Sequence, residues 1–117
     1  MPITLGNNTY TFSSIDTLTG SGNDDAVTFS AVQTGASADL AGGNDTVTLA
    51  AGTNSLTLSN VETITGGTGA DAVTLSGTVT GTSIDLDAGN DTLSLGAGPA
   101  TVSIQNVETT TGGAGVD

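Results

Sequence analysis

The sequence predicts an all-β fold, a parallel β-solenoid of the β-roll or β-helix type with about five coils. The main observation is that the sequence repeats every 46 residues without gaps. Segment 14–20, for example, aligns with 60–66 and again with 106–112. A fixed period of this length is typical of architectures in which each unit packs on its neighbours. We therefore expect a single domain over residues 1–117, made of about two and a half repeats of two coils each.

Short alternating segments predict the strands of these coils. Val73 and Leu75 alternate with Thr74, and Leu93 and Leu95 follow the same pattern. Period-2 alternation rich in Thr and β-branched residues, and bounded by Gly and Pro, indicates half-buried strands, and no helical periodicity is present. If each repeat contains one shorter and one longer coil, the inward side chains should form two columns, namely Val47, Val73 and Leu93, and Leu49, Leu75 and Leu95.

The charge of the chain is extreme, because twelve carboxylates and no Lys, Arg or His give a formal net charge of −12. No salt bridge can form between side chains, and the self-repulsion of the folded state must be screened or neutralised. Without cationic side chains, nucleic acid is excluded as an electrostatic partner. The absence of His, Cys and Lys also excludes zinc sites, disulfides and the usual general bases, so we do not expect an enzyme. No apolar run approaches the roughly 20 residues that span a membrane.

Aspartate-bearing turns separate the predicted coils. Gly66–Thr74 reads Gly-Gly-Thr-Gly-Ala-Asp-Ala-Val-Thr and matches the nonapeptide G-G-x-G-x-D-x-U-x at each specified position. In-register stacking would place the aspartates in one column on one edge, about 5 Å apart. Ca²⁺ binds six to eight oxygens and would convert their repulsion into attraction, with carbonyls of the glycine turns completing its shell. The aspartates of this series, at alternately shorter and longer spacings, are Asp25, Asp45, Asp71, Asp91 and Asp117.

The nonapeptide at Gly66–Thr74 and the segment 112–117 resemble the calcium-binding repeat of the RTX (repeats-in-toxin) family, and the turns at 43–46 and 89–92 resemble its variants. The resemblance implies a β-roll that is folded by several Ca²⁺ ions bound to loop aspartates and loop carbonyls. It also implies export by a type I system, with low cytoplasmic calcium leaving the chain unfolded until it reaches the outside of the cell. The candidate metal ligands are then Asp24, Asp25, Gly43, Asn44, Asp45, Gly67, Gly69, Asp71, Asp87, Gly89, Asn90, Asp91, Gly115 and Asp117.

The longer coils and the phrase Asn-Val-Glu-Thr look more like surface-layer and adhesin repeats than toxin repeats. Only one turn per predicted coil carries the motif, which favours a single calcium ladder. We therefore expect a structural, extracellular role in a surface layer, a matrix filament or an adhesin. Neither end carries an obvious capping repeat, so the chain is either a segment of a longer repeat protein or self-associates end to end.

Alternatives to this interpretation stay open. The aspartates could bond only to nearby backbone in Asx-turns. The chain could be the calcium-binding repeat of a secreted enzyme or toxin, or an ice-binding module. The last needs a regular row of Thr and Asn in the turns, but Ser21, Gly42, Thr68, Ala88 and Ala114 occupy the corresponding turn positions. A second acidic series, which recurs with the period of the repeat, is expected on the solvated outer face, and its members are Asp16, Glu62 and Glu108.

Overall fold

The computed structural model describes residues 2–6 and 9–117, and each strand pairs in parallel with its neighbours. The strands follow the alternation of the sequence, with buried and more exposed side chains in turn, as in β7 and β9. They are β1 (Pro2–Thr4), β2 (Thr9–Phe12), β3 (Thr17–Thr19), β4 (Ala26–Phe29), β5 (Thr34–Asp39), β6 (Thr46–Thr48), β7 (Ser55–Ser59), β8 (Thr63–Thr65), β9 (Ala72–Leu75), β10 (Val79–Asp85), β11 (Thr92–Leu95), β12 (Ala100–Gln105) and β13 (Thr109–Thr111).

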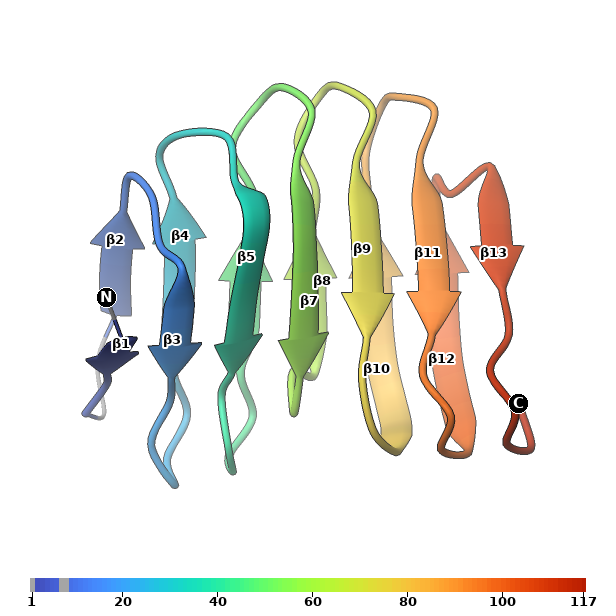
Figure 1. Cartoon of the computed structure of the whole chain (residues 1–117), viewed down its shortest axis with the longest axis horizontal. Helices are drawn as coiled ribbons and strands as arrows, with labels where there is room; N and C mark the ends of the chain where they lie inside the picture. Colours follow the sequence, from blue (N-terminus) through green and yellow to red (C-terminus); the bar gives the residue numbers. More distant parts are fainter. Residues whose placement is uncertain (1, 7–8) are drawn as a thin grey trace.

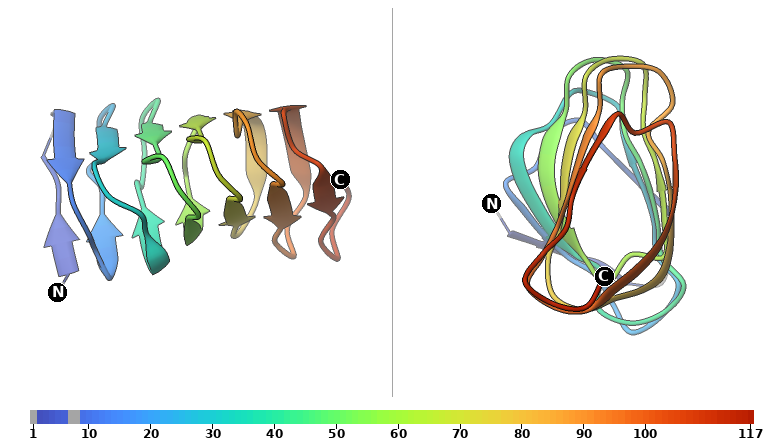
Figure 2. Two further views of the ribbon diagram at one scale, coloured as in Figure 1. Left: turned by 90° about the horizontal axis from the view of Figure 1, so that it is seen from above. Right: turned by 90° about the vertical axis from the view of Figure 1, so that its right-hand side faces the viewer.

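Two sheets face each other across one core (Figure 1). Sheet A holds the odd-numbered strands in the order β1-β3-β5-β7-β9-β11-β13, and sheet B holds the even-numbered strands in the order β12-β10-β8-β6-β4-β2. Because consecutive strands alternate between the sheets, the chain winds around the core, and its coils superpose as a flattened loop in the axial view (Figure 2). Strands β3 to β12 form five complete coils, so the predicted parallel β-solenoid of about five coils is confirmed.

The coils differ from those that the spacing of the aspartates predicted. The longer predicted coil, from Asp45 to Asp71, would place Thr48 of β6 beside Thr74 of β9. In the structure Thr48 pairs with Thr65 of β8 instead, and β9 belongs to the other sheet. The prediction of alternately shorter and longer coils, two per repeat, is therefore wrong. One repeat contains five strands, that is, two and a half coils.

Because each repeat has an odd number of strands, equivalent strands of successive repeats lie in opposite sheets. Thr17 lies in β3 of sheet A, its equivalent Thr63 lies in β8 of sheet B, and Thr109 lies in β13 of sheet A again. Successive repeats are thus related by about half a turn around the solenoid axis together with a translation of two and a half coils. Residues that are equivalent in sequence consequently face opposite sides of the molecule.

This arrangement corrects the predicted core columns. Val47 stacks with Val27 and Ile64 in sheet B, whereas Val73 and Leu93 stack with each other in sheet A. Leu49 similarly follows β6 in sheet B, whereas Leu75 and Leu95 are paired in sheet A. The alternation in the sequence identified the inward residues correctly, since the buried apolar side chains form one continuous core.

The five-strand arrangement predicts which residues can be cross-linked. The chain has no cysteine, and Thr48 of β6 is paired with Thr65 of β8. Neighbouring parallel strands are about 4.8 Å apart, which lies within the Cα–Cα range of a disulfide. A Thr48→Cys/Thr65→Cys variant should therefore form an intramolecular disulfide on mild oxidation, measured by non-reducing electrophoresis and mass spectrometry.

The control is Thr48→Cys/Thr74→Cys, because Thr74 would neighbour Thr48 only in a solenoid with the longer predicted coil. Thr74 lies in β9 of sheet A, opposite β6 of sheet B. Preferential oxidation of this second pair would contradict the register.

Candidate functional site

Acidic side chains form two stacked series, each located immediately before the strands of one sheet. In Figure 1 the strands of sheet A begin at the upper edge of the solenoid and those of sheet B begin at the lower edge. The two series therefore run along opposite edges. The B ladder consists of Asp25, Asp45 and Glu62, before β4, β6 and β8, and the A ladder consists of Asp71, Asp91 and Glu108, before β9, β11 and β13.

Within the B ladder, the carboxylates of Asp45 and Glu62 each accept a hydrogen bond from the backbone of the preceding coil. The Asp25 N–H donates to Asp45 Oδ1 (2.7 Å), and the Asp45 N–H donates to Glu62 Oε2 (2.8 Å). These N–H groups lie at the strand starts, where the coil changes direction. The carboxylates satisfy them with charge-assisted hydrogen bonds, which are stronger than neutral ones.

The A ladder repeats this arrangement in the next repeat of the chain. The Asp71 N–H donates to Asp91 Oδ1 (2.7 Å), and the Asp91 N–H donates to Glu108 Oε2 (2.7 Å). Both ladders thus consist of two aspartates and one glutamate joined by the same bonds. Since the two triads share no side chain, this contact is a property of the repeat.

Two amide side chains extend the A ladder toward the N-terminus. The Ile15 N–H donates to Gln33 Oε1 (3.1 Å), the Gln33 N–H to Asn54 Oδ1 (2.9 Å), and the Asn54 N–H to Asp71 Oδ1 (3.0 Å). Gln33 and Asn54 are almost completely buried. Neither residue was predicted from the sequence, because neither belongs to the repeated acidic turn, although each directly precedes a strand as the aspartates do.

The predicted single column of five aspartates is wrong. Asp45 neighbours Asp25 and Glu62 in the B ladder, whereas Asp71 neighbours Asn54 and Asp91 in the A ladder. The nonapeptide Asp71 therefore has one of its two expected partners, Asp91, and not the other.

The expectation that Asp16, Glu62 and Glu108 form one solvated outer column is also wrong. Glu62 and Glu108 accept backbone hydrogen bonds within the ladders, on opposite edges of the solenoid. Asp16 precedes β3 of sheet A, on the same edge as Glu108. Of this series only Asp16 and Glu108 are exposed, and Glu62 is half-buried.

Most other predicted ligands lie on the turns outside the ladders. Asp24 is exposed, and its Oδ1 accepts a hydrogen bond from the Asn44 N–H (2.9 Å). Asp117 is exposed as well, and its Oδ2 accepts from the Gly113 N–H (2.8 Å). The exposed members of the remaining set are Gly43, Asn44, Asp87, Gly89 and Asn90, and the half-buried members are Gly67, Gly69 and Gly115.

The glycines of these turns are required by the close approach of neighbouring coils. A Cβ at Gly69 would lie 2.6 Å from the carbonyl carbon of Gly52, and one at Gly43 would lie 2.6 Å from that of Asn23. The φ angles of Gly69 and Gly43, 132° and 129°, also lie where residues with a side chain are rarely found. The glycine pattern thus has a structural cause in the stacking of the turns, whether or not an ion is bound there.

Burial leaves several carboxylate oxygens of the ladders without a hydrogen-bond partner. Asp25, Asp45, Asp71 and Asp91 are at most 2% exposed. Within the described residues, Asp25 Oδ1, Asp45 Oδ2 and Asp91 Oδ2 are buried and accept no hydrogen bond. A buried polar atom without a partner costs free energy, and a charged one costs more. A cation at the second oxygen of each of these carboxylates would offset that cost.

The surroundings of Asp45 and Asp91 raise the pKa of both carboxyl groups. Burial raises the pKa of Asp45 to about 6; the charges of Glu62, Asp25 and Asp24 add to the rise, and the bond from the Asp25 N–H opposes it. Burial likewise raises the pKa of Asp91, again opposed by a backbone hydrogen bond. No cationic side chain exists in the sequence that could reverse these shifts.

The donor set of the ladders fits a hard cation in part. Carboxylate oxygens are the ligands that Ca²⁺ prefers, and the unpartnered oxygens accept no hydrogen bond that an ion would have to replace. However, among residues 2–6 and 9–117 no group of three or more Asp or Glu side chains converges closely enough to hold a metal ion. An ion on a ladder would take carboxylates from neighbouring coils and complete its shell with turn carbonyls and water.

Comparison of the chain with models of known protein families, with curated proteins and with solved structures found no significant match. None of the described segments is a helix of the length and hydropathy that crossing a membrane requires.

The raised pKa of Asp45 predicts how stability depends on pH in the presence of a chelator. The folded state holds this proton up to about pH 6, whereas an unfolded aspartate loses it near pH 3.9. The folded state thus binds more protons in this interval, so the free energy of unfolding should fall as the pH rises from about 4 to about 6. The full loss for a shift of this size is up to about 3 kcal/mol, and it can be measured by urea unfolding at a series of pH values.

An Asp45→Asn variant should flatten this dependence, because asparagine retains the acceptor for the Asp25 N–H and cannot ionise. The matched control is Asp39→Asn, since Asp39 is exposed and its Oδ1 accepts a hydrogen bond from Asn60 Nδ2 (2.7 Å). A wild-type stability that rises with pH over this interval would contradict the prediction.

Proposed function

We propose that the chain is a structural module of an extracellular repeat protein, in which divalent cations, Ca²⁺ first among them, bind along the two carboxylate ladders and stabilise the solenoid. The observation that carries this proposal is the set of buried carboxylate oxygens without a partner, in a chain of net charge −12 that has no cationic side chain. Such charges require neutralisation from outside the chain.

The choice of acid over amide in the ladders supports a role beyond hydrogen bonding. Gln33 and Asn54 accept backbone N–H groups in the same way as the aspartates, and they do so without charge. If the ladder residues served only as acceptors, as in the Asx-turn alternative, the amides would suffice at less cost. The acidic members of each triad are therefore best explained by a bound cation.

The proposed binding residues are those with unpartnered buried oxygens, together with the glutamate that ends each triad. In the B ladder these are Asp25, Asp45 and Glu62, and in the A ladder Asp91 and Glu108. Ions would lie on both edges of the solenoid, because the ladders do. This differs from the single calcium ladder that the sequence predicted.

The proposed extracellular location follows from the proposed dependence of folding on Ca²⁺. Calcium is scarce in the cytoplasm and abundant outside the cell, so a solenoid that depends on it would fold only after export. This fits a surface layer, a matrix filament or an adhesin, with secretion by a type I system. Self-association would be end to end, through pairing between the outermost strands of two copies.

Calcium should raise the melting temperature of the chain at pH 7.5, followed by circular dichroism during a titration that starts in EDTA. At 100 times the dissociation constant a single site adds about 2.7 kcal/mol, which corresponds to roughly 10 °C for a domain of this size. An Asp45→Asn/Asp91→Asn variant should lose most of this increase, whereas Asp39→Asn should retain it.

Sodium chloride at the same ionic strength is the control for charge screening. An equal increase with sodium, or an unchanged calcium response in the double variant, would contradict the proposal. Light scattering on the same samples measures self-association, and a monomer with and without Ca²⁺ would refute the end-to-end contact alone.

Ice binding is a second candidate, favoured by a row of threonines on sheet B. Thr11, Thr28, Thr48 and Thr65 are paired in succession along β2, β4, β6 and β8. The row lies on the outer face of sheet B, because the residues next to each threonine in β4, β6 and β8 are buried in the core. This row lies in the strands, whereas the row expected from the sequence would lie in the turns.

If this row binds ice, the chain should show thermal hysteresis that Thr48→Lys abolishes. The control is Thr74→Lys, since Thr74 is exposed in sheet A, on the other face. Thermal hysteresis that is absent from the wild type, or equal in the two variants, would exclude this function.

A further inference from the structure

The side-chain amide of Asn54 lies among three oxygen atoms at the upper edge of the solenoid. Its Nδ2 atom donates to the carbonyl oxygens of Ala50 (2.8 Å) and Gly52 (3.1 Å) and to Asp71 Oδ1 (2.9 Å). Asn54 is completely buried, and its Oδ1 atom accepts the Gln33 N–H of the preceding coil. The amide therefore connects its own turn to the carboxylate of the next coil.

Asp71 consequently has hydrogen-bond donors at both of its carboxylate oxygens. Its Oδ1 atom accepts from the N–H (3.0 Å) and the Nδ2 of Asn54, and its Oδ2 atom accepts from the Gly67 N–H (3.3 Å). Asp91, the next member of the A ladder, accepts the Asp71 N–H at Oδ1 and has a buried Oδ2 without a partner. Both aspartates are 1% exposed, so the difference between them lies in the donors that surround them.

The contacts of Asn54 Nδ2 resemble the surroundings that a hard cation requires. Ca²⁺ is bound by carboxylate and backbone carbonyl oxygens at about 2.3–2.6 Å, which places neighbouring ligands about 3 Å apart. The nitrogen contacts one carboxylate and two carbonyls at similar separations. Its two N–H groups direct partial positive charge at these oxygens, so the amide satisfies atoms that would otherwise attract an ion.

The next repeat shows that the fold does not need this amide to satisfy the backbone. Ala100 occupies the position equivalent to Asn54. The Ala100 N–H donates to the backbone carbonyl of Val116 (3.0 Å), whereas the Asn54 N–H donates to the carboxylate of Asp71. A backbone carbonyl can therefore replace the side-chain acceptor, and the contact that only asparagine supplies is the one from its Nδ2 atom.

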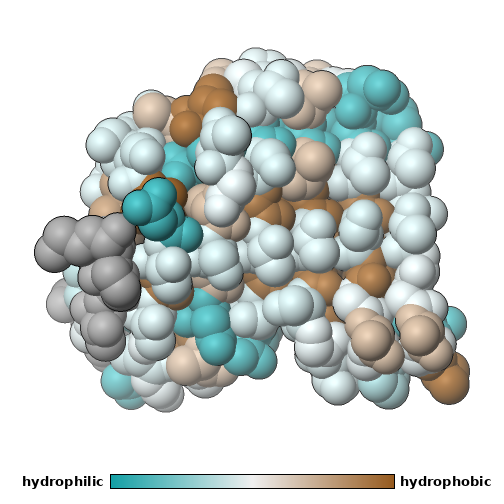
Figure 3. Space-filling view, viewed as in Figure 1, coloured by the Kyte–Doolittle hydropathy of each residue, from teal (hydrophilic) through white to brown (hydrophobic). Residues whose placement is uncertain are grey.

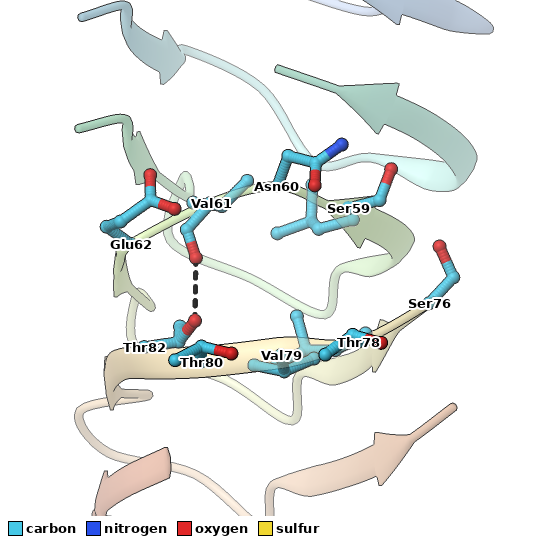
Figure 4. Close-up of a pocket in the computed structure, with 11 residues that line it drawn as sticks. Ser59, Asn60, Val61, Glu62, Ser76, Thr78, Val79, Thr80 and Thr82 are labelled. Carbon is cyan, nitrogen blue, oxygen red and sulfur yellow. Dashed lines mark hydrogen bonds between the residues drawn. The ribbon is translucent and has the colours of Figure 1, made fainter. Parts of the chain in front are cut away.

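The second amide of the A ladder is also absent from the next repeat. Val79 occupies the position equivalent to Gln33 and lines a pocket of about 210 Å³ at the lower edge, between the turn that follows β7 and the start of β10. Figure 3 shows the notch beneath β7 where the pocket opens. Figure 4 shows Thr82, whose Oγ1 donates to the Val61 carbonyl (2.8 Å). The two amides thus belong to the first repeat and not to the fold in general.

We propose that the Asn54 amide takes the place of a bound cation beside Asp71, so that Asp71 binds no calcium and the ions of the A ladder lie at Asp91 and Glu108. This inference rests on the proposed function. It differs from the expectation that the aspartate of the nonapeptide Gly66–Thr74 is a calcium ligand. The corner at Asn54 then stays closed with or without calcium, whereas the corner at Asp91 depends on it.

The first test replaces the two aspartates separately and measures the calcium response of the melting temperature. Asp71→Asn should melt at a lower temperature than the wild type in EDTA, because asparagine has one acceptor oxygen instead of two. Calcium should nevertheless raise its melting temperature by as much as in the wild type. Asp91→Asn is the matched variant and should lose the part of the increase that the A ladder supplies. A response in Asp71→Asn as small as that in Asp91→Asn would overturn the proposal.

The second test converts the amide into an ion ligand. Asn54→Asp places a fourth oxygen beside those of Ala50, Gly52 and Asp71, and without an ion its charge is buried and unpaired. This variant should bind one more Ca²⁺ than the wild type in isothermal titration calorimetry. Its melting temperature should fall in EDTA and recover in calcium.

The control is Asn60→Asp, because Asn60 Nδ2 also donates to an aspartate, Asp39 (2.7 Å), but at the exposed surface. It should bind no additional ion. An unchanged ion count in folded Asn54→Asp would overturn the proposal; if circular dichroism shows that this variant does not fold, the comparison of Asp71→Asn with Asp91→Asn decides. A wild type that does not respond to calcium would contradict the proposed function, whereas these results in a responsive wild type contradict only the present inference.

Discussion

The structure depends on one hydrogen bond, from the backbone N–H before a strand to a side chain of the next coil. Sheet pairing cannot satisfy this N–H, because the chain changes direction there. Asp45 and Asp91 fulfil this role in the middle of each triad, and Gln33 and Asn54 fulfil it where no acid is present. The contact connects coil to coil along both edges. It therefore adds to a core that, with one short strand of each sheet per coil, buries little apolar surface per residue.

Carboxylates make this contact at an electrostatic cost that amides avoid. A charge-assisted bond is stronger than a neutral one, but the second oxygen of Asp25, Asp45 and Asp91 is buried without a partner. Because the chain has no cationic side chain, no ion pair between side chains offsets that cost. The five-strand repeat moderates the problem, since it divides the acids between opposite edges instead of concentrating them in one column. Among the described residues, each run of stacked acids thereby contains three.

The sequence contained enough to predict the solenoid, the strands and the inward residues, because period-2 alternation and the long repeat depend only on local pattern. It did not contain the assignment of strands to sheets. The Gly-Asn-Asp turn before Thr46 and the Asn-Val-Glu phrase before Thr63 are both corners of the solenoid, yet only the first resembles a turn motif. The predicted coils were therefore too long, because the corner before Thr63 was not recognised as a corner. The same omission predicted one ladder of aspartates instead of two. Gln33 and Asn54 escaped notice because their positions are occupied by Val79 and Ala100 in the next repeat.

Differences between equivalent positions are more informative here than the repeat itself. Gly35 and Gly81 have similar φ angles of 69° and 73°, although the buried carboxamide of Gln33 lies beside the first and Val79 lies at the equivalent position beside the second. The fold consequently does not require a glutamine at this position in each repeat. Once backbone bonds and core packing fix the coil, a side chain at such a corner can be exchanged without altering the solenoid. Substitutions of this kind would allow a repeat protein to acquire a binding site at one coil while its neighbours remain structural.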